Sequence, residues 1–263
     1  MMNKYQKPAI TLILFIVVTV ISLPTASGEM RSTNKQLAGT PPFEVLKKII
    51  AANQTAVETY VDPRKGFAPL ITWLTDPDVR IQPYVVMKSP ADTLFTCRNM
   101  GAQLEVSAGQ VEYGIRHLHT PILLITLDSD NQFIRLFMEG YADMAPAIRQ
   151  ELDHLHLPME EDKSKESFQE RLIQNVEANI DYQVDRAVSL YKDRIDMGRL
   201  AVIGTIADFA NVYKRGAGRL IIINVNGEKD DGRLRDLPMM VSISPQMRKV
   251  SIGRERPKPV PQN

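Results

Sequence analysis

Residues 121–131 read Pro-Ile-Leu-Leu-Ile-Thr-Leu-Asp-Ser-Asp-Asn, and this stretch decides the fold class. Its first seven residues are almost continuously apolar and rich in branched side chains, and four polar residues follow at once. A run of this kind predicts a parallel strand covered on both faces, because the side chains on both faces must then be apolar. A shorter apolar run at residues 70–74 is followed by a second polar segment, Asp76-Pro77-Asp78-Val79-Arg80. These two polar segments are the most informative part of the chain for function.

The pattern of apolar residues along the rest of the chain predicts alternating strands and helices. We expect strands at residues 70–74, 93–97, 121–127, 200–206 and 219–225. We expect helices at residues 42–60, 105–118, 132–152 and 167–195, the third interrupted at Pro146. This alternation predicts an α/β fold in which a mostly parallel sheet is flanked by helices, with a long helix near the N-terminus.

The N-terminus has the three parts of a secretory signal peptide. Lys4 and Lys7 precede an apolar run at residues 9–21, and small residues just before Glu29 suit cleavage there. The run is shorter than the ~20 apolar residues of a membrane-spanning helix. We therefore expect a periplasmic or secreted protein with no stable membrane span after cleavage. An uncleaved membrane anchor is the alternative.

These features divide the chain into four parts. We expect a signal peptide at residues 1–28, a linker at 29–40, an α/β domain at 41–227 and a C-terminal extension at 228–263. The end of that extension, residues 254–263, is rich in proline and charge and is predicted to be disordered. No internal repeat is evident.

The composition excludes several classes of function. The formal net charge of +1 gives no general attraction for nucleic acid or an anionic membrane. Cys97 is the only cysteine, so no disulfide can form within the chain, and no Cys/His cluster has zinc-finger spacing. Neither the Gly-x-Ser-x-Gly motif of the α/β-hydrolases nor a phosphate-binding P-loop is present.

Five local matches, in the same order along the chain, resemble the β-class carbonic anhydrases, especially the secreted bacterial type. They lie at residues 44–54, 94–99, 111–118, 175–180 and 198–204. For example, Leu-Phe-Thr-Cys-Arg-Asn at 94–99 resembles the family's Leu-Phe-Val-x-Arg-Asn. The resemblance covers most of the predicted domain. It implies a β-carbonic-anhydrase-like fold and a homodimer formed through the N-terminal helix and the sheet edge.

The resemblance also implies where a zinc site would lie. Ungapped counting places the family's Cys-x-Asp-x-Arg motif on Asp76 to Arg80 and its His-x-x-Cys-Gly motif on Asp128 to Gln132. Asp76, Asp128 and Asn131 would then replace the three zinc ligands, while Asp78 and Arg80 would keep the family's Asp–Arg dyad. Such zinc sites use thiolate and imidazole ligands, and the zinc lowers the pKa of its bound water toward ~7. We therefore expect no zinc and no ordinary zinc-dependent hydration of carbon dioxide.

Three interpretations of the altered site stay open, so whether the chain is an enzyme is not decided by its sequence. The first is a pseudoenzyme without a cofactor, in which Asp78 and Arg80 form a structural ion pair. Such a protein could also be an anion-binding or assembly module, with Arg80 and Arg98 binding bicarbonate or a small carboxylate without turning it over. The second is a hard-cation site, in which the carboxylates of Asp76, Asp78 and Asp128 and the amide of Asn131 bind Mg²⁺, Ca²⁺ or Mn²⁺. The third is an active carbonic anhydrase, converting carbon dioxide to bicarbonate through a hydroxide on a carboxylate-bound metal.

Overall fold

The computed structural model describes residues 41–58, 68–87, 93–157 and 166–257. The predicted signal peptide and linker, and residues 258–263 of the predicted tail, lie outside the described residues. Among the residues that are described, no helix is both long enough and apolar enough to cross a membrane. The chain divides into two units, residues 1–61 and 62–263.

The described part of the first unit is one helix, α2 (Pro42–Glu58), which matches the predicted helix at 42–60. Proline suits the first turn of a helix, where its missing N–H would have no partner. Of the apolar residues that gave the helical pattern, Phe43, Leu46 and Ile49 are more than half exposed. The helix is therefore amphipathic, and nothing in the described part of its own unit covers its apolar face.

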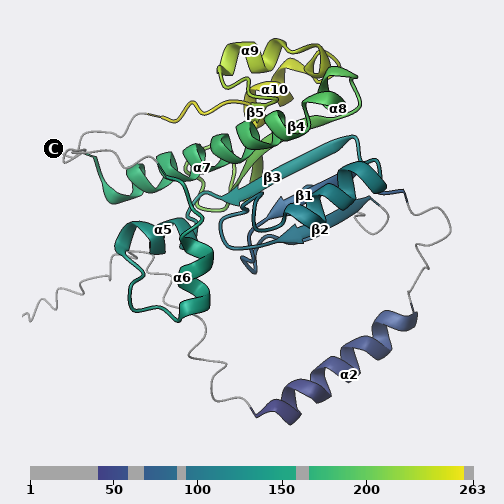
Figure 1. The fold of residues 1–263 in the computed structure, drawn as a ribbon, viewed down its shortest axis with the longest axis vertical. Helices are drawn as coiled ribbons and strands as arrows, with labels where there is room; N and C mark the ends of the chain where they lie inside the picture. The colour runs from purple at the N-terminus through teal and green to yellow at the C-terminus, as the bar shows by residue number, and fades with distance from the viewer. Residues whose placement is uncertain (1–40, 59–67, 88–92, 158–165, 258–263) are drawn as a thin grey trace, which may run out of the picture. The chain divides into compact units, whose positions relative to one another are not determined.

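The second unit is built on a five-stranded sheet (Figure 1). Its strands are β1 (Ile71–Thr75), β2 (Leu94–Arg98), β3 (Ile122–Asp128), β4 (Ala201–Asp208) and β5 (Arg219–Val225), in the order β2-β1-β3-β4-β5. The first four are parallel, and β5 is antiparallel to β4. Every predicted strand is present, displaced by no more than two residues at either end. The predicted α/β fold with a mostly parallel sheet is confirmed.

The helices differ from the prediction mainly in where they break. Residues 105–118 form α4 (Ala108–Glu112) followed by a π-helical turn, η1 (Tyr113–His117). Residues 132–152 form α5 (Gln132–Glu139) and α6 (Pro146–Leu152), because Gly140 with φ 97° ends the first and Pro146 begins the second. Residues 167–195 form α7 (Phe168–Leu190) and α8 (Lys192–Asp196), separated at Tyr191. A short helix, α3 (Pro83–Val86), was not predicted.

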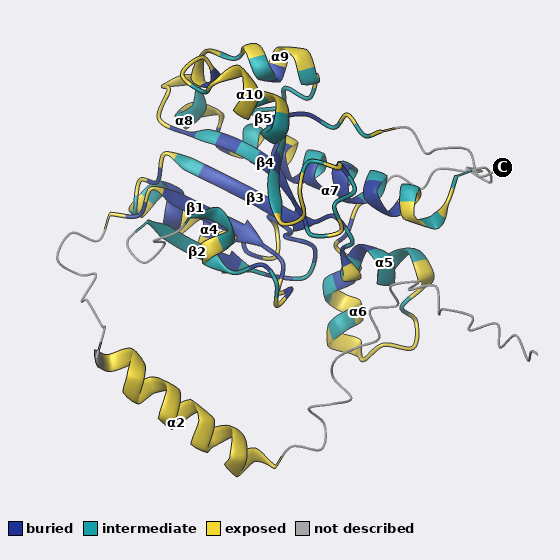
Figure 2. Cartoon of the chain, turned by 180° about the vertical axis from the view of Figure 1, so that it is seen from behind, coloured by how far each residue is buried: buried dark blue, intermediate teal, exposed yellow. Residues whose placement is uncertain are grey.

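Helix α7 is the main cover of one face of the sheet and runs across β3, β4 and β5 (Figure 1). A capping box formed by Ser167 and Glu170 starts it. Gly204 on β4 permits close approach, because a Cβ at this position would lie 2.5 Å from Cγ2 of Ile180. The strands between the covering layers are largely buried (Figure 2). The sheet therefore holds its strand ends in a rigid frame.

The C-terminal segment adds short helices beside β5: α9 (Asp231–Asp236), the 3₁₀ turn η2 (Pro238–Met240) and α10 (Pro245–Ser251). They pack through a small apolar cluster that includes Val225 and Leu234. Of the predicted tail, residues 254–257 lie within the described part of the chain. Arg254 Nη2 donates to Asp181 Oδ1 at 2.6 Å, and Arg256 Nη1 donates to Glu177 Oε1 at 2.9 Å. Carboxylates on α7 thus supply partners that the local sequence does not reveal.

Candidate functional site

The five predicted site residues lie together at the carboxyl ends of β1 and β3. These strands are parallel neighbours, with Thr75 opposite Thr126, so the segments that follow them leave the sheet at the same edge. Asp76 follows β1 directly, and Asp128 is the last residue of β3. Asn131 is the residue before the first turn of α5. Asp78 and Arg80 lie on the loop after β1, and hydrogen bonds connect all five side chains.

Arg80 is the centre of this group, because each of its three nitrogen atoms donates to carboxylate oxygens. Nε donates to Asp78 Oδ1 at 3.0 Å, and Nη2 donates to Asp78 Oδ2 and Asp128 Oδ2, both at 2.8 Å. Nη1 donates to the two oxygens of Asp130 at 3.0 and 3.2 Å. A guanidinium has five N–H donors, and here each of its three nitrogens has a carboxylate partner. An external anion at Arg80 would therefore compete with carboxylates that already contact it.

The amide of Asn131 is oriented by the helix that it caps. Its Oδ1 accepts hydrogen bonds from the backbone N–H groups of Phe133 and Ile134 at 3.1 and 3.0 Å. These are N–H groups of the first helical turn, which have no partner within the helix. Because the oxygen faces the helix, Nδ2 faces the acids and donates to Asp128 Oδ1 at 2.7 Å and to Asp76 Oδ2. In this arrangement Asn131 is a hydrogen-bond donor between two acids.

Asp76 and Asp128 form a buried pair of acids, and neither side chain is exposed to solvent. Burial raises the pKa of Asp76 to about 6, although hydrogen bonds from the Asp78 backbone and from Asn131 act in the opposite direction. Burial and the adjacent charge of Asp76 raise the pKa of Asp128 well above its ordinary value. Acids that interact this strongly titrate as a pair. Burial and mutual repulsion therefore make the pair hold a proton to a higher pH than an exposed carboxyl group would.

Asp78 behaves in the opposite way, although it is also buried. Burial acts to raise the pKa of Asp78, but hydrogen bonds from the side chain and backbone of Arg80 hold it below its ordinary value. Burial likewise acts to lower the pKa of Arg80, and its carboxylate partners raise it above the usual value. Asp78 and Arg80 are therefore a charged pair, next to an acid pair that shares a proton.

Arg98, the second arginine expected near the strand ends, holds the loop after β1. Its Nη1 donates to the carbonyl oxygen of Asp76 at 3.1 Å, and its Nη2 to that of Ile81 at 2.6 Å. Its guanidinium carbon lies 5.6 Å from the ring centroid of Trp73. These contacts fasten both ends of segment 76–81, and so fix the loop that carries Asp78 and Arg80.

Two residues of the cluster were not predicted as site residues. Asp130 accepts from Arg80, and the ring centroid of Phe209, just after β4, lies 5.0 Å from the Arg80 guanidinium carbon. Asp130 was visible in the sequence, because it lies between Asp128 and Asn131, but its role depends on the direction of the Arg80 side chain. No local signal marks Phe209, which approaches only because β3 and β4 are neighbours.

The donor set does not fit zinc. Within the described ranges, no three His, Cys, Asp or Glu side chains are arranged to hold a metal ion. Zinc sites use thiolate, imidazole or carboxylate ligands, usually with sulfur or nitrogen among them, and the cluster has neither a thiolate nor an imidazole. A hard cation would use oxygen ligands, but nitrogen atoms of Arg80 and Asn131 lie against those oxygens. That Asp76, Asp128 and Asn131 replace zinc ligands stays a prediction.

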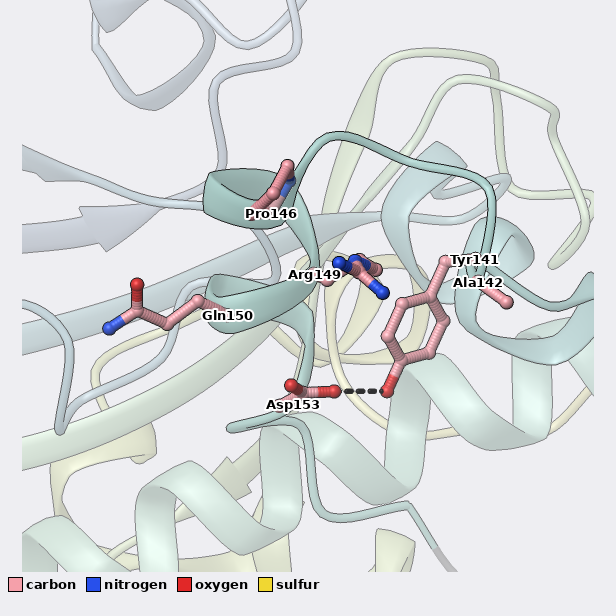
Figure 3. A pocket seen from close by; sticks show the side chains of 6 residues that line it. All are labelled: Tyr141, Ala142, Pro146, Arg149, Gln150 and Asp153. Carbon is pink, nitrogen blue, oxygen red and sulfur yellow. Dashed lines mark hydrogen bonds between the residues drawn. The ribbon is translucent and has the colours of Figure 1, made fainter.

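A separate pocket of about 590 Å³ lies at the loop that joins α5 to α6 (Figure 3). Tyr141, Arg149 and Asp153 line it, and Tyr141 Oη donates to Asp153 Oδ1 at 2.8 Å. None of the five predicted site residues lines this pocket. It is therefore distinct from the strand-end cluster.

Comparisons with known proteins agree with the fold. A sequence model of the carbonic anhydrase family matches residues 71–213, more than half of the chain. No curated protein sequence matches it. One of two tetrameric β-carbonic anhydrases from the filamentous ascomycete Sordaria macrospora aligns with a TM-score of 0.53 and 16% identity, covering 69% of this chain and 95% of that one. A Coccomyxa β-carbonic anhydrase, solved with acetazolamide, aligns with a TM-score of 0.54 and 16% identity, covering 75% and 90%.

Proposed function

The chain belongs to the β-class carbonic anhydrase family, and we propose that it is an exported pseudoenzyme that lacks zinc-dependent hydration of carbon dioxide. The observation that carries this proposal is the position of Arg80. Its Nη2 lies 2.8 Å from oxygens of both Asp78 and Asp128, so a protein cation already lies against the acids at the strand ends. A metal ion at these oxygens would have to displace Arg80.

The chemistry of the acids also supports the proposal. Zinc-dependent hydration needs a metal-bound water whose pKa is lowered toward ~7. Asp76 and Asp128 are fully buried, so neither is placed to take a proton from water in an open cleft. Asp78 is ion-paired to Arg80 and has no free charge to offer. The remaining dyad orients the loop after β1 and supplies no nucleophile.

Metal content and catalysis, measured on the same sample, test the proposal. The untagged protein, purified without chelator, is analysed for zinc, magnesium, calcium and manganese per mole of chain, and carbon dioxide hydration is followed by stopped flow. We expect no stoichiometric metal and no hydration above the buffer rate. About one zinc per chain together with hydration would overturn the proposal. A stoichiometric hard cation that is lost in Asp128→Ala would favour the carboxylate-site alternative.

A matched variant shows that the assay can detect zinc in this fold. The triple substitution Asp76→Cys, Asp128→His and Asn131→Cys supplies the ligand types that the family resemblance implies. We expect this variant to bind about one zinc per chain when the wild-type chain binds none. Zinc binding by both proteins would show that the wild-type cluster accepts the metal despite Arg80.

Two further parts of the proposal concern partners and location. We propose a homodimer, supported by the exposed apolar face of α2 and by the tetrameric state named for the Sordaria macrospora relatives. Sedimentation of the wild-type protein beside Leu46→Glu/Ile49→Glu tests the use of this face. We propose export through residues 1–28, for which a mature N-terminus at Glu29 is the expected result. Bicarbonate or a small carboxylate stays a predicted ligand, tested by titration into the same sample.

A further inference from the structure

A pocket of about 360 Å³ lies at the amino ends of β3 and β4, away from the acid cluster. It is lined by His119, Pro121, Arg194 and Arg199. Pro121 directly precedes β3, and its carbonyl oxygen accepts from the N–H of Ala201, the first residue of β4, at 2.9 Å. At about 3.3 Å per residue, β3 separates this pocket from Asp128 by roughly 20 Å. The two sites are therefore independent.

Arg194 is held in a fixed direction beside the pocket. Its Nη2 lies 2.8 Å from the carbonyl oxygen of Ile115 and 2.8 Å from Nδ1 of His119. Because a guanidinium can only donate, Nδ1 of His119 must accept, and the ring proton is then on Nε2. His119 has φ 57°, a left-handed conformation that is strained for a non-glycine residue. The turn thus holds the ring against Arg194 at an energetic cost.

Arg199 is brought to the same pocket by the turn that ends α8. Its backbone N–H donates to the carbonyl oxygen of Arg194 at 2.9 Å, and Gly198 between them has φ 66°. This is the hydrogen-bond pattern of a glycine-terminated helix. The guanidinium of Arg199 forms no hydrogen bond or ion pair with any residue in the described part of the chain. The guanidinium of Arg199 is therefore exposed to solvent at the pocket.

The charges around the pocket are unbalanced. No carboxylate lines it, and no ion pair of Arg194 or Arg199 occurs among the described residues. The acids of α8 are already engaged, because Asp193 pairs with Arg116 at 2.9 Å and Asp196 pairs with Lys192 at 2.7 Å. By contrast, the larger pocket of Figure 3 carries Asp153 in its wall beside Arg149. In the pocket at the amino ends, both charged lining residues are arginines.

We propose that this pocket binds a small multivalent oxyanion of the phosphate type. Two guanidinium groups and the Nε2–H of a neutral imidazole supply several N–H donors, and guanidinium forks match phosphate oxygens in geometry. The volume is within the range of small-molecule sites, so the phosphate group of a small metabolite would fit as well as the free ion. The proposal does not depend on whether the acid cluster at the other end of the sheet is active.

Titration of the untagged protein with inorganic phosphate, followed by calorimetry, tests the proposal. We expect saturable binding at one site that weakens with added chloride. Arg199→Gln should weaken binding at least about tenfold, since a hydrogen bond from a charged donor contributes about 1.5–3 kcal/mol. Arg149→Gln removes the same charge from the other pocket and should leave the affinity unchanged. No saturable binding by the wild-type protein would overturn the proposal.

Two more outcomes separate a built site from general electrostatics. Equal losses in Arg199→Gln and Arg149→Gln would show that phosphate responds only to net charge, and would overturn the proposal. His119→Asn keeps a residue type that tolerates the left-handed conformation, but removes the ring that orients Arg194. We expect it to weaken phosphate binding as well, and unchanged binding would exclude His119 from the site. Asp128→Ala should bind phosphate like the wild type, whatever its effect on metal content.

Discussion

The arginine side chains at the two ends of β3 differ in whether carboxylates pair with them. At the carboxyl end, Arg80 contacts three carboxylates and is enclosed by them. At the amino end, Arg194 and Arg199 line an open pocket without a carboxylate partner. Arg80 is thus paired within the fold, whereas Arg194 and Arg199 remain available to a ligand. Under the proposed function the acid cluster is structural, and the arginines without a carboxylate partner lie at the opposite end of the sheet.

The energetics of the two ends should differ accordingly. A buried ion pair contributes little net stability compared with apolar residues, but removal of one partner leaves an uncompensated charge and costs about 3–5 kcal/mol. An exposed, unpaired cation contributes almost nothing to stability. Substitutions at the two ends therefore distinguish a charge that the fold requires from a charge that a ligand would use.

Arg80→Met should have the largest effect. It removes the cation from Asp78 and Asp128, which are both buried, so we expect the unfolding free energy at pH 7 to fall by about 3–5 kcal/mol. The loss should be smaller at pH 5, because Asp78 then takes up a proton more readily without its partner. Urea denaturation at both pH values measures the effect.

Arg116→Met is the matched control for that experiment. Arg116 also pairs with two carboxylates, Glu112 and Asp193, but all three side chains are more than a third exposed. Exposed pairs contribute about 0–1 kcal/mol. If the two variants lose the same stability, the buried ion pairs of Arg80 contribute no more than the exposed pairs of Arg116, and our description of the acid cluster is wrong.

Asp76→Asn should have an intermediate effect with a distinctive pH dependence. The folded-state pKa of Asp76 is raised from 3.8 to about 6, so the folded state binds more protons than the unfolded chain between those values. Its contribution is therefore most favourable below about pH 4 and is lost as the pH rises through about 6, a change of roughly 2–3 kcal/mol. The amide cannot ionise, so the variant should gain stability relative to the wild type over this range.

Urea denaturation from pH 4 to pH 8 measures this difference, with Asp143→Asn as control. Asp143 is exposed, so its substitution should leave the pH dependence of the unfolding free energy unchanged. A difference between Asp76→Asn and the wild type that does not change with pH would mean that Asp76 is ionised throughout. The acid pair would then share no proton.

The sequence was sufficient to predict the sheet and the meeting of the two polar segments. Apolar runs such as residues 121–127 can be recognised as strands from their own sequence, because a strand covered on both faces has apolar side chains on both. Once β1 and β3 are parallel neighbours, Asp76 and Asp128 must lie at the same edge. The family resemblance supplied the pairing of these strands, which composition alone does not give.

What the sequence could not predict depends on side-chain direction and on long-range packing. Arg80 contacts Asp130 as well as Asp128 because of the path of the loop after β1. Arg98, on β2, fixes that path through its hydrogen bonds to the loop. The order of residues 254–256 depends on carboxylates of α7 that are more than 70 residues away. The cationic pocket joins two turns, at His119 and Gly198, whose left-handed conformations are not encoded by hydrophobic periodicity.

Arg199→Gln should have the smallest effect on stability. It tests whether the arginines at the amino end of β3 lack a partner within the fold. The side chain is exposed and has no carboxylate partner among the described residues, so we expect the unfolding free energy to change by less than about 0.5 kcal/mol without phosphate. With phosphate, ligand binding should raise the melting temperature of the wild type more than that of the variant. A loss of several kcal/mol without phosphate would show that Arg199, like Arg80, is neutralised within the fold. Both ends of β3 would then be structural, and the contrast between them would fail.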